Sequence, residues 1–241
     1  MSTLIAFQNI SKNFGGVWAL RGITFNVHEG EIVGLVGPNG AGKTTLLKIC
    51  MNILKPSQGF VKYKGLKITG LSPHKTCKLG ISMTNQIPRP FKRMTCLENV
   101  LVACLFGASL KKSEAERVAE TILDQVFLSH KKYTIAGELT AFELKLLDLA
   151  IALATGPKFL MLDEPLAGST EKEIAQIVSI IKRLREEGVT ILWVEHVLSE
   201  VMKNSDRIVV LNEGRKIVEG EPQEVANDKR FIEAYLGEGV A

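Results

Sequence analysis

The chain has 241 residues, of which 46% are hydrophobic and 23% are charged, and its formal net charge is +4. This balance is typical of a packed globular protein, and the length suits one α/β domain or a main domain with a small insert. No basic start precedes a long apolar run, and no stretch approaches the ~20 apolar residues that cross a bilayer, so we expect neither a signal peptide nor a channel or carrier formed by this chain alone.

Four cysteines are scattered through the chain: Cys50, Cys77, Cys96 and Cys104. They form no CxxC pair, which argues against a zinc or redox site. Scattered thiols fit a reducing cytosol.

The first part of the chain is predicted to be rich in strands. Residues 4–7 and 23–27 have the apolar spacing of strands, and residues 32–36 are continuously apolar, which is typical of a strand buried on both faces. Residues 42–53 show helical spacing, and residues 60–68 return to strand character.

The stretch from about Pro88 to Pro157 is predicted to be a helical insert. Ser113 followed by Glu116 matches a capping box, in which the hydroxyl and the carboxylate satisfy free backbone amides at a helix start. Residues 144–154 predict another apolar-faced helix.

Strands and helices then alternate again. Residues 159–162 predict a buried strand and residues 189–194 a further strand. Between them Thr170 and Glu173 form a capping box for a helix that runs to Gly188 as its C-cap.

Two short apolar runs, residues 208–211 and 216–219, flank a turn and predict a hairpin. Strands that alternate with helices favour a mainly parallel sheet covered on both faces.

The strongest motif is a glycine-rich loop that fits G-x-x-x-x-G-K-[ST] between a strand and a helix. Its glycines allow left-handed backbone angles, so that main-chain amides and a helix N-terminus face an anion. We expect Lys43 at the β- and γ-phosphates, Thr44 at Mg²⁺ and Thr45 at the α-phosphate. The loop consists of Gly37, Pro38, Asn39, Gly40, Ala41, Gly42, Lys43, Thr44 and Thr45. It predicts nucleotide binding but does not choose between a kinase, a switch and a transport ATPase.

An apolar strand ends in two adjacent acids, Asp163 and Glu164. Unpaired charges at the edge of a core are costly, which favours a functional reason for the pair over a capping or loop role. In a phosphate-loop fold Asp163 can hold Mg²⁺ through its water, and Glu164 can orient the attacking water.

Together with Gln86 and with Glu195-His196 after another strand, these motifs resemble the ATP-binding cassette (ABC) family over nearly the whole chain. Further stretches resemble the ATPase subunits of branched-chain amino acid importers: residues 13–16, 86–91, 164–168 and 206–212.

The resemblance implies further site residues. Phe14 would stack on the adenine, although a core phenylalanine near a turn is the alternative. Gln86 would complete the Mg²⁺ shell and report ATP occupancy to a membrane partner. His196 would contact the γ-phosphate, so the catalytic set is Glu164, His196 and Lys43.

One motif departs from the family pattern, whose signature is usually Leu-Ser-Gly-Gly-Gln. Here the matching residues after a leucine are Thr140, Ala141, Phe142 and Glu143. Phe142 replaces a glycine, and Glu143 brings a negative charge near a triphosphate; two unit charges at ~4 Å interact by ~1 kcal/mol in water and ~4 kcal/mol at an effective dielectric of ~20. We expect a weakened composite site. Thr170 likewise stands where an Asp or Asn is expected.

The expected fold is α/β: a phosphate-loop NTPase core, mainly a parallel sheet with helices on both faces plus an N-terminal antiparallel β part, with an inserted helical subdomain. One ATP-binding domain would span residues 1–241, with its core at 1–87 and 157–241 and the helical subdomain at about 88–156.

The expected function is that of an ATP-binding, ATP-hydrolysing subunit that couples hydrolysis to solute transport, with import of branched-chain amino acids or similar solutes as the best match. ATP and Mg²⁺ are the expected cofactors. Transmembrane permease subunits, a second ABC ATPase subunit (a heterodimer before a homodimer) and an extracellular solute-binding protein are the expected partners, without nucleic acid. The location would be peripheral, on the cytoplasmic face of the cell membrane.

Rival interpretations remain. The altered signature favours a nucleotide-gated regulatory or structural cassette with little turnover, whereas Glu164 and His196 speak against it. A cassette acting on ribosomes or DNA and a small-molecule kinase fit the motifs less well.

Overall fold

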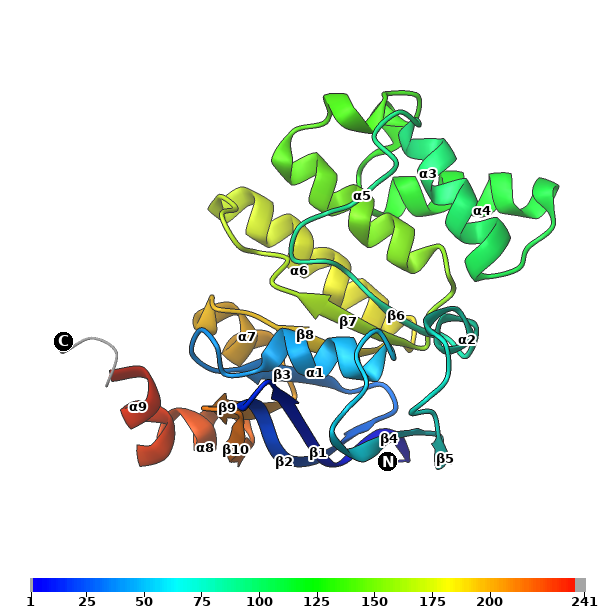
Figure 1. Ribbon diagram of the computed structural model, residues 1–241. Helices are drawn as coiled ribbons and strands as arrows, with labels where there is room; N and C mark the ends of the chain where they lie inside the picture. The colour runs from blue at the N-terminus through cyan, green and yellow to red at the C-terminus, as the bar shows by residue number, and fades with distance from the viewer. Residues whose placement is uncertain (1, 237–241) are drawn as a thin grey trace.

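The computed structural model describes residues 2–236. Within this range the strands form two sheets, a four-stranded antiparallel sheet of order β2-β1-β4-β5 and a six-stranded sheet of order β10-β9-β3-β8-β7-β6 (Figure 1). The smaller sheet consists of β1 (Thr3–Phe14), β2 (Val17–His28), β4 (Gln58–Tyr63) and β5 (Leu66–Lys67). The larger consists of β3 (Ile32–Val36), β6 (Ile81–Met83), β7 (Phe159–Asp163), β8 (Thr190–Val194), β9 (Arg207–Asn212) and β10 (Arg215–Gly220). All its neighbours pair in parallel except β10 with β9.

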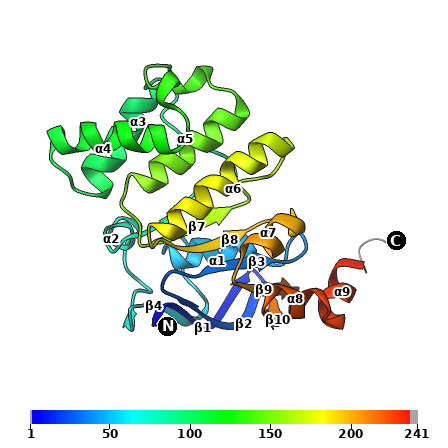
Figure 2. The ribbon, with the colours of Figure 1, turned by 180° about the vertical axis from the view of Figure 1, so that it is seen from behind.

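Helices fill the connections. Outside the insert they are α1 (Lys43–Cys50), α2 (Pro73–Lys78), α6 (Glu171–Glu186), α7 (Leu198–Asn204), α8 (Pro222–Ala226) and α9 (Lys229–Leu236). Between β6 and β7 lie α3 (Cys96–Val102), the π-helix η1 (Ala103–Gly107), α4 (Lys112–Gln125), the 3₁₀ turns η2 (Ser129–Lys131) and η3 (Ala136–Glu138), and α5 (Ala141–Leu153). Figures 1 and 2 show these insert helices gathered at the end of the molecule opposite the antiparallel sheet. The expected fold class is confirmed, while the exact boundaries at residues 88 and 156 stay a prediction.

The central strands separate two apolar cores, because alternate side chains of a strand point to opposite faces. On β3, Val33 and Leu35 pack with the antiparallel sheet and α1. Ile32 and Val36 face the other core, formed with helices α3 to α8. The continuous apolar run of β3 is thus explained by burial on both faces.

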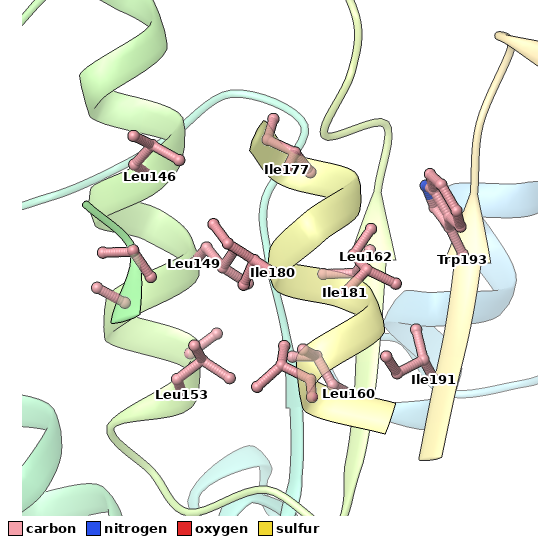
Figure 3. Close-up of a cluster of buried hydrophobic side chains, with 14 of the residues drawn as sticks. Leu146, Leu149, Leu153, Leu160, Leu162, Ile177, Ile180, Ile181, Ile191 and Trp193 are labelled. Atoms are coloured by element: carbon pink, nitrogen blue, oxygen red, sulfur yellow. The ribbon is translucent and has the colours of Figure 1, made fainter. Parts of the chain in front are cut away.

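Helix α6 joins the insert to the sheet. It lies between α5 and strands β7 and β8, as Figure 3 shows. The labelled contacts are Leu146, Leu149 and Leu153 of α5; Ile177, Ile180 and Ile181 of α6; Leu160 and Leu162 of β7; and Ile191 and Trp193 of β8. A continuous apolar interface therefore connects α5 to the strand that carries Asp163.

Three sequence-based elements need correction. The helix expected over residues 42–53 stops at Cys50, because Asn52 has a left-handed backbone (φ 57°) and its amide donates to Ile68 O and Thr76 Oγ1. The strand expected over 60–68 is broken by a turn at Lys64 and Gly65 into β4 and β5.

The capping box expected at Ser113 and Glu116 is wrong. The chain enters α4 at Lys111, whose backbone is extended, so Ser113 lies inside the first turn and caps nothing. The capping box of Thr170 and Glu173 is confirmed, although α6 ends at Glu186 and the left-handed Gly188 follows two residues later.

No helix within residues 2–236 combines the length and the apolar character that a bilayer crossing requires.

We predict that Ile180→Ala lowers the free energy of unfolding by about 2–5 kcal/mol, because its side chain is 1% exposed between α5 and the sheet and truncation leaves a cavity. Ile87→Ala is the matched control, since Ile87 is 71% exposed and should change stability by less than about 0.5 kcal/mol. Urea unfolding followed by circular dichroism measures both, and equal losses would contradict the assignment of this core.

Candidate functional site

The carboxyl ends of four neighbouring parallel strands carry the polar residues singled out in the sequence. In the order β3, β8, β7 and β6, these ends lead into the glycine-rich loop, Glu195-His196, Asp163-Glu164 and Gln86. A crevice outside the carboxyl ends of parallel strands is where open α/β sheets bind ligands. Strand pairing thus brings together segments that are far apart in the sequence.

The loop after β3 needs glycine for steric reasons at two positions. A Cβ on Gly37 would lie 2.0 Å from the carbonyl oxygen of Leu211, and one on Gly42 would lie 2.4 Å from the carbonyl oxygen of Ala19. Gly42 is the left-handed residue from which α1 begins. Lys43 is buried, and its Nζ donates to the carbonyls of Gly37 at 2.5 Å and Pro38 at 2.9 Å, so the ammonium lies inside the loop.

The end of β7 faces the start of α1. The hydroxyl of Thr44 donates to Asp163 Oδ1 at 3.1 Å. Burial raises the pKa of the Asp163 carboxyl, the hydrogen bond from Thr44 lowers it, and the neighbouring Glu164 raises it. A hydroxyl and a carboxylate oxygen at one point are hard donors of the kind that Mg²⁺ prefers alongside phosphate and water. No group of three or more His, Cys, Asp or Glu side chains that could hold a metal occurs within residues 2–236.

Glu164 is the centre of the site. It is 8% exposed, and each carboxylate oxygen has a partner: Gln86 Nε2 donates to Oε2 at 2.7 Å, and His196 Nε2 lies 2.6 Å from Oε1. Its backbone is left-handed (φ 53°), which costs a non-glycine residue on the order of 1 kcal/mol. Such strain persists only where the surroundings hold it. Here the left-handed backbone directs the carboxylate between Gln86, which follows β6, and His196, which follows β8.

Glu195 has a supporting position that the sequence did not reveal. Its side chain is fully buried and accepts from the backbone amides of Leu166 at 2.5 Å and His196 at 2.9 Å. Burial raises the pKa of this carboxyl, and both backbone donors lower it. Glu195 therefore ties the segment after Glu164 to the segment that carries His196.

Helix α5 holds the other side of the site through two residues one turn apart. Asp148, which is buried, accepts from the backbone amide of Asn85 at 2.7 Å and from its Nδ2 at 3.1 Å. Lys145 donates to the carbonyl of Ala167 and, at 3.1 Å, to Ser169 Oγ. The sequence signal that could have identified Asp148 is a single acid in an otherwise apolar helix segment.

Phe14 joins the site from the antiparallel sheet. It is 47% exposed and lines a cleft of about 600 Å³ together with Thr44, Thr45, Gln86 and Asp163. The ring is therefore not a core side chain, which removes the alternative weighed from the sequence. Lys12 Nζ lies 4.9 Å from its centroid.

The four signature residues lie at the start of α5. Thr140 is its N-cap: its hydroxyl accepts from the Glu143 amide at 3.2 Å, and the Glu143 carboxylate accepts from the Thr140 amide at 2.8 Å. Lys131 Nζ lies 3.5 Å from Glu143, and Phe142 packs partly against the helical core. The hydrogen bond with the Thr140 backbone is the main cause that holds the pKa of Glu143 below its ordinary value. Burial opposes this shift, and the Thr140 hydroxyl and Lys131 add to it.

The ion pair with Lys131 therefore offsets part of the negative charge of Glu143, so the expected repulsion between Glu143 and a triphosphate is weaker. The charge of Glu143 is used within the subunit, to cap α5 and to pair with Lys131. Among the hydrogen bonds of residues 2–236, neither Thr140 nor Glu143 contacts the glycine-rich loop. Ala141 of the signature nevertheless lines a cleft together with Gln86, so the start of α5 adjoins the cluster around Glu164.

Comparison with known proteins gives a consistent result. A family model described as ABC transporter matches residues 20–167. The chain is 36% identical to the high-affinity branched-chain amino acid transport ATP-binding protein BraF of Pseudomonas aeruginosa, with 98% of both chains covered. It is also 36% identical to the probable branched-chain amino acid transport ATP-binding protein LivG of Archaeoglobus fulgidus, over 97% of this chain and 95% of the other.

Solved structures agree in fold. A nucleotide-free ATP-binding cassette from an ABC transporter matches with a TM-score of 0.87 and 32% identity, over 97% of this chain and 99% of the other. A dimeric ATP-binding cassette in a post-hydrolysis state, bound to ADP and phosphate, matches with a TM-score of 0.83 and 26% identity, over 91% and 99% of the two chains.

We predict that Thr140→Ala lowers the free energy of unfolding by about 1 kcal/mol, because one amide of α5 loses its cap. Thr121→Ala is the control, since Thr121 is exposed inside α4 and its loss should change stability by less than about 0.5 kcal/mol. Urea unfolding at pH 7 compares the two.

The same experiment with Glu143→Gln tests the charge. A lowered pKa in the folded state stabilises the fold above the unfolded pKa of about 4.3, and this contribution is lost as the pH falls through the lower folded pKa. The wild type should therefore exceed the variant in stability by a constant amount from pH 8 to 6, and the difference should shrink as the pH falls below about 4. A difference that grew on acidification would contradict the assignment.

Proposed function

This chain belongs to the ABC transporter family as an ATP-binding and ATP-hydrolysing subunit, and from that premise we propose that it drives the import of branched-chain amino acids or similar solutes through a separate membrane permease. The names of its relatives support the solute class. The observation that supports the hydrolytic mechanism is the Glu164 carboxylate, which lies within hydrogen-bonding distance of Gln86 and His196 beside Asp163 and the glycine-rich loop.

The nucleotide would extend from the loop to Phe14. The amides of residues 37–45 and the positive end of α1 would hold the phosphates, with Lys43 exchanging its loop carbonyls for β- and γ-phosphate oxygens. The half-exposed ring of Phe14 offers a face for the adenine. The 600 Å³ cleft between these points supports this path.

Hydrolysis would centre on Glu164. Its carboxylate accepts a hydrogen bond from a water and aligns that water with the γ-phosphorus, as a positioned base does. His196, which lies 2.6 Å from the same carboxylate, holds the γ-phosphate and fixes the orientation of the acid. Gln86 contacts the other oxygen, so a movement of its segment would alter the geometry of the base.

The oxygen donors Thr44, Asp163 and Gln86 are the residues that would hold Mg²⁺, with Asp163 acting through water. When bound, the ion offsets the charge that the phosphate oxygens develop. The fit rests on the donor chemistry, since hydroxyl, carboxylate and amide oxygens are ligands that Mg²⁺ accepts.

A permease would dock beside Gln86. A cleft of about 390 Å³ adjoins this residue, lined by the segment after β6 and the start of α5, including Ile87, Pro88, Leu144 and Lys145. Large apolar side chains near it are exposed: Ile87 at 71%, and Phe91 at 58%. Exposed apolar surface next to a nucleotide-sensing residue suits a partner that responds to ATP. The permease would hold this subunit at the cytoplasmic face of the membrane, and an extracellular solute-binding protein would deliver the substrate.

A second, related ATPase subunit would complete the site. The dimeric cassette among the similar structures supports a paired arrangement. In this pair the partner's signature would complete the Glu164 site, while the altered residues Thr140, Ala141, Phe142 and Glu143 would leave the partner's own nucleotide in a weaker site. The contrast between an intact Asp163-Glu164 and a signature used for helix capping supports two unequal sites.

The regulatory alternative, a cassette that binds ATP without useful turnover, has no support from the family findings. The altered signature is the one feature that favoured it.

We expect Glu164→Gln to reduce ATP hydrolysis by about 10²–10⁴-fold and to leave the Kd for ATP within about threefold of wild type, because the amide keeps the shape but cannot accept a proton. Phosphate release and calorimetry measure the two quantities. Glu138→Gln, at an exposed acid, is the control and should change neither. Lys43→Ala should abolish ATP binding. Unchanged ATP binding in Lys43→Ala together with unchanged turnover in Glu164→Gln would refute the site.

Restoring the signature tests the unequal pair. We expect the purified chain alone to hydrolyse ATP slowly, and Phe142→Gly combined with Glu143→Gln to raise its rate at least about tenfold, because a composite site then lacks the ring and the charge. Phe106→Gly with Glu138→Gln is the matched control at exposed positions. Rapid cooperative hydrolysis by the unaltered homodimer would argue against two unequal sites.

Uptake in cells tests the transported solute. Deleting the gene for this chain should abolish uptake of labelled leucine, isoleucine and valine, and the wild-type chain but not its Lys43→Ala form should restore it. Normal uptake after deletion would exclude this solute class without affecting the ATPase assignment.

A further inference from the structure

Acidic residues are distributed unevenly along this chain. Between Glu31 and Glu98 there is no Asp or Glu, whereas the same 66 residues contain 11 Lys and Arg. An even spread of the chain's 26 acids would put about seven of them in a stretch of this length. The nearly neutral balance of the whole chain therefore hides one strongly basic segment.

Much of this charge gathers on the β4–β5 hairpin and the following helix α2. Lys62 and Lys67 are directly opposed across the two strands. Both ammonium groups lie over one ring, that of Phe60, at 5.6 Å and 5.3 Å from its centroid. Like charges directly opposed across a strand pair destabilise the sheet, and one aromatic face offsets this only in part.

Few acids neutralise these cations. Lys64 lies 4.0 Å from Glu29, an ion pair that is half exposed on both sides. Within residues 2–236, no ion pair involves Lys62, Lys67, Lys75 or Lys78. The cations are also accessible: Lys64, Lys67, Lys75 and Lys78 are exposed.

The tip of the hairpin adds an apolar group. Leu66, between Gly65 and Lys67, is 75% exposed. Phe106 has the same exposed fraction, and no other large apolar side chain of the described residues is more exposed. An apolar side chain flanked by lysines partitions into the boundary between headgroups and acyl chains, while the ammonium groups stay at the phosphates.

We use the term basic hairpin surface for the surface formed by Lys62, Lys64, Leu66, Lys67, Lys75 and Lys78. This surface suits lipid better than nucleic acid. Binding of single-stranded nucleic acid relies on open aromatic faces on which bases stack. Here the Phe60 ring is covered by two ammonium groups, and Tyr63 is 7% exposed. The exposed apolar side chain of Leu66 would gain nothing from contact with a charged phosphate backbone.

In the chain, the basic hairpin surface is followed directly by the segment of the proposed permease side. Figures 1 and 2 show the β4–β5 hairpin and α2 along one edge of the molecule, from which β6 leads directly into Gln86 and Ile87. The same acid-free stretch continues through Arg89, Lys92 and Arg93. The basic residues of this stretch therefore occur both on the hairpin and at the cleft at which a membrane partner would dock, where Lys92 is one of the lining residues.

We propose that the basic hairpin surface binds the anionic phospholipid surface of the membrane directly, in addition to any contact with a permease. Phospholipid phosphates would lie between Lys62 and Lys67 and relieve their repulsion, while Leu66 enters the headgroup layer. This contact needs neither nucleotide nor permease, so it can be tested independently of the proposed transport function.

The test is co-sedimentation of the purified full chain with vesicles of phosphatidylcholine alone or with about 30% phosphatidylglycerol. Each lysine near an anionic surface contributes a roughly fivefold gain in partition before screening. We expect the wild type to bind only the anionic vesicles. Vesicle binding should fall by about threefold in Leu66→Ser. It should fall by at least about tenfold in the quadruple variant Lys62→Gln, Lys67→Gln, Lys75→Gln and Lys78→Gln. Because screening weakens surface charges, binding by the wild type should fall steeply between 0.05 and 0.5 M salt, about the range over which the Debye length drops several-fold.

The matched control is the quadruple variant Lys111→Gln, Lys112→Gln, Lys172→Gln and Lys203→Gln, at exposed lysines on other elements. Both variants bring the formal net charge of +4 to zero. The control should retain vesicle binding within about twofold. Both variants should keep wild-type ATP hydrolysis, and the pair Lys62→Gln and Lys67→Gln should keep or raise Tm, since a repulsion is removed.

Three results would overturn the proposal. The first is equal binding to neutral and anionic vesicles, and the second is equal loss in the two quadruple variants, which would indicate net charge alone. The third is tighter binding to a single-stranded RNA oligonucleotide than to the anionic vesicles, lost in the same lysine variant, which would assign the surface to nucleic acid. A failure of ATP hydrolysis in the wild type would contradict the proposed function but not this inference.

Discussion

The parallel pairing of β3, β8, β7 and β6 is the constraint on which the rest of the molecule depends. It aligns four carboxyl ends at one edge, so that Lys43, Asp163, Glu164, Gln86 and His196 meet although 153 positions separate the first from the last in the sequence. Because main-chain hydrogen bonds set this register, a slip of one residue would turn every strand side chain to the other core and would move the acids away from the loop.

Helix α5 connects the site to the insert. Its apolar side packs on α6, and through α6 on β7 and β8 (Figure 3), while Lys145 and Asp148 hold the segments that follow Glu164 and precede Gln86. The first turn of the same helix is the altered signature. Any displacement of α5 is therefore felt at both segments, which gives a physical connection between the start of this helix and the carboxylate that would direct water.

Charge is used differently in the two halves of the molecule. Around the site and in the insert, acids are paired with nearby donors, as Glu143 is with the Thr140 amide and Lys131, or Glu195 with two backbone amides. Along the β4–β5 hairpin and α2, Lys62, Lys67, Lys75 and Lys78 have no ion pair within residues 2–236, and Lys64 has only a half-exposed one with Glu29. Paired charges order the fold from within, whereas unpaired ones stay available to an external anion. A peripheral subunit of a membrane transporter has use for both.

Local chemistry alone determined much of this protein. The glycine-rich loop, the acid pair after an apolar strand, the capping box at Thr170 and the buried strands could all be predicted, because each depends on residues that are close in sequence. Tertiary structure decided what depends on distant neighbours: Asn52 ends α1 because Ile68 and Thr76 accept its amide, and Glu143 caps a helix and pairs with Lys131 instead of facing outward unpaired. Likewise the partnership of Asp148 with Asn85, and the opposition of Lys62 and Lys67, arise only when the chain folds back on itself, since a side chain's partners are set by the packing of segments that the local pattern does not specify.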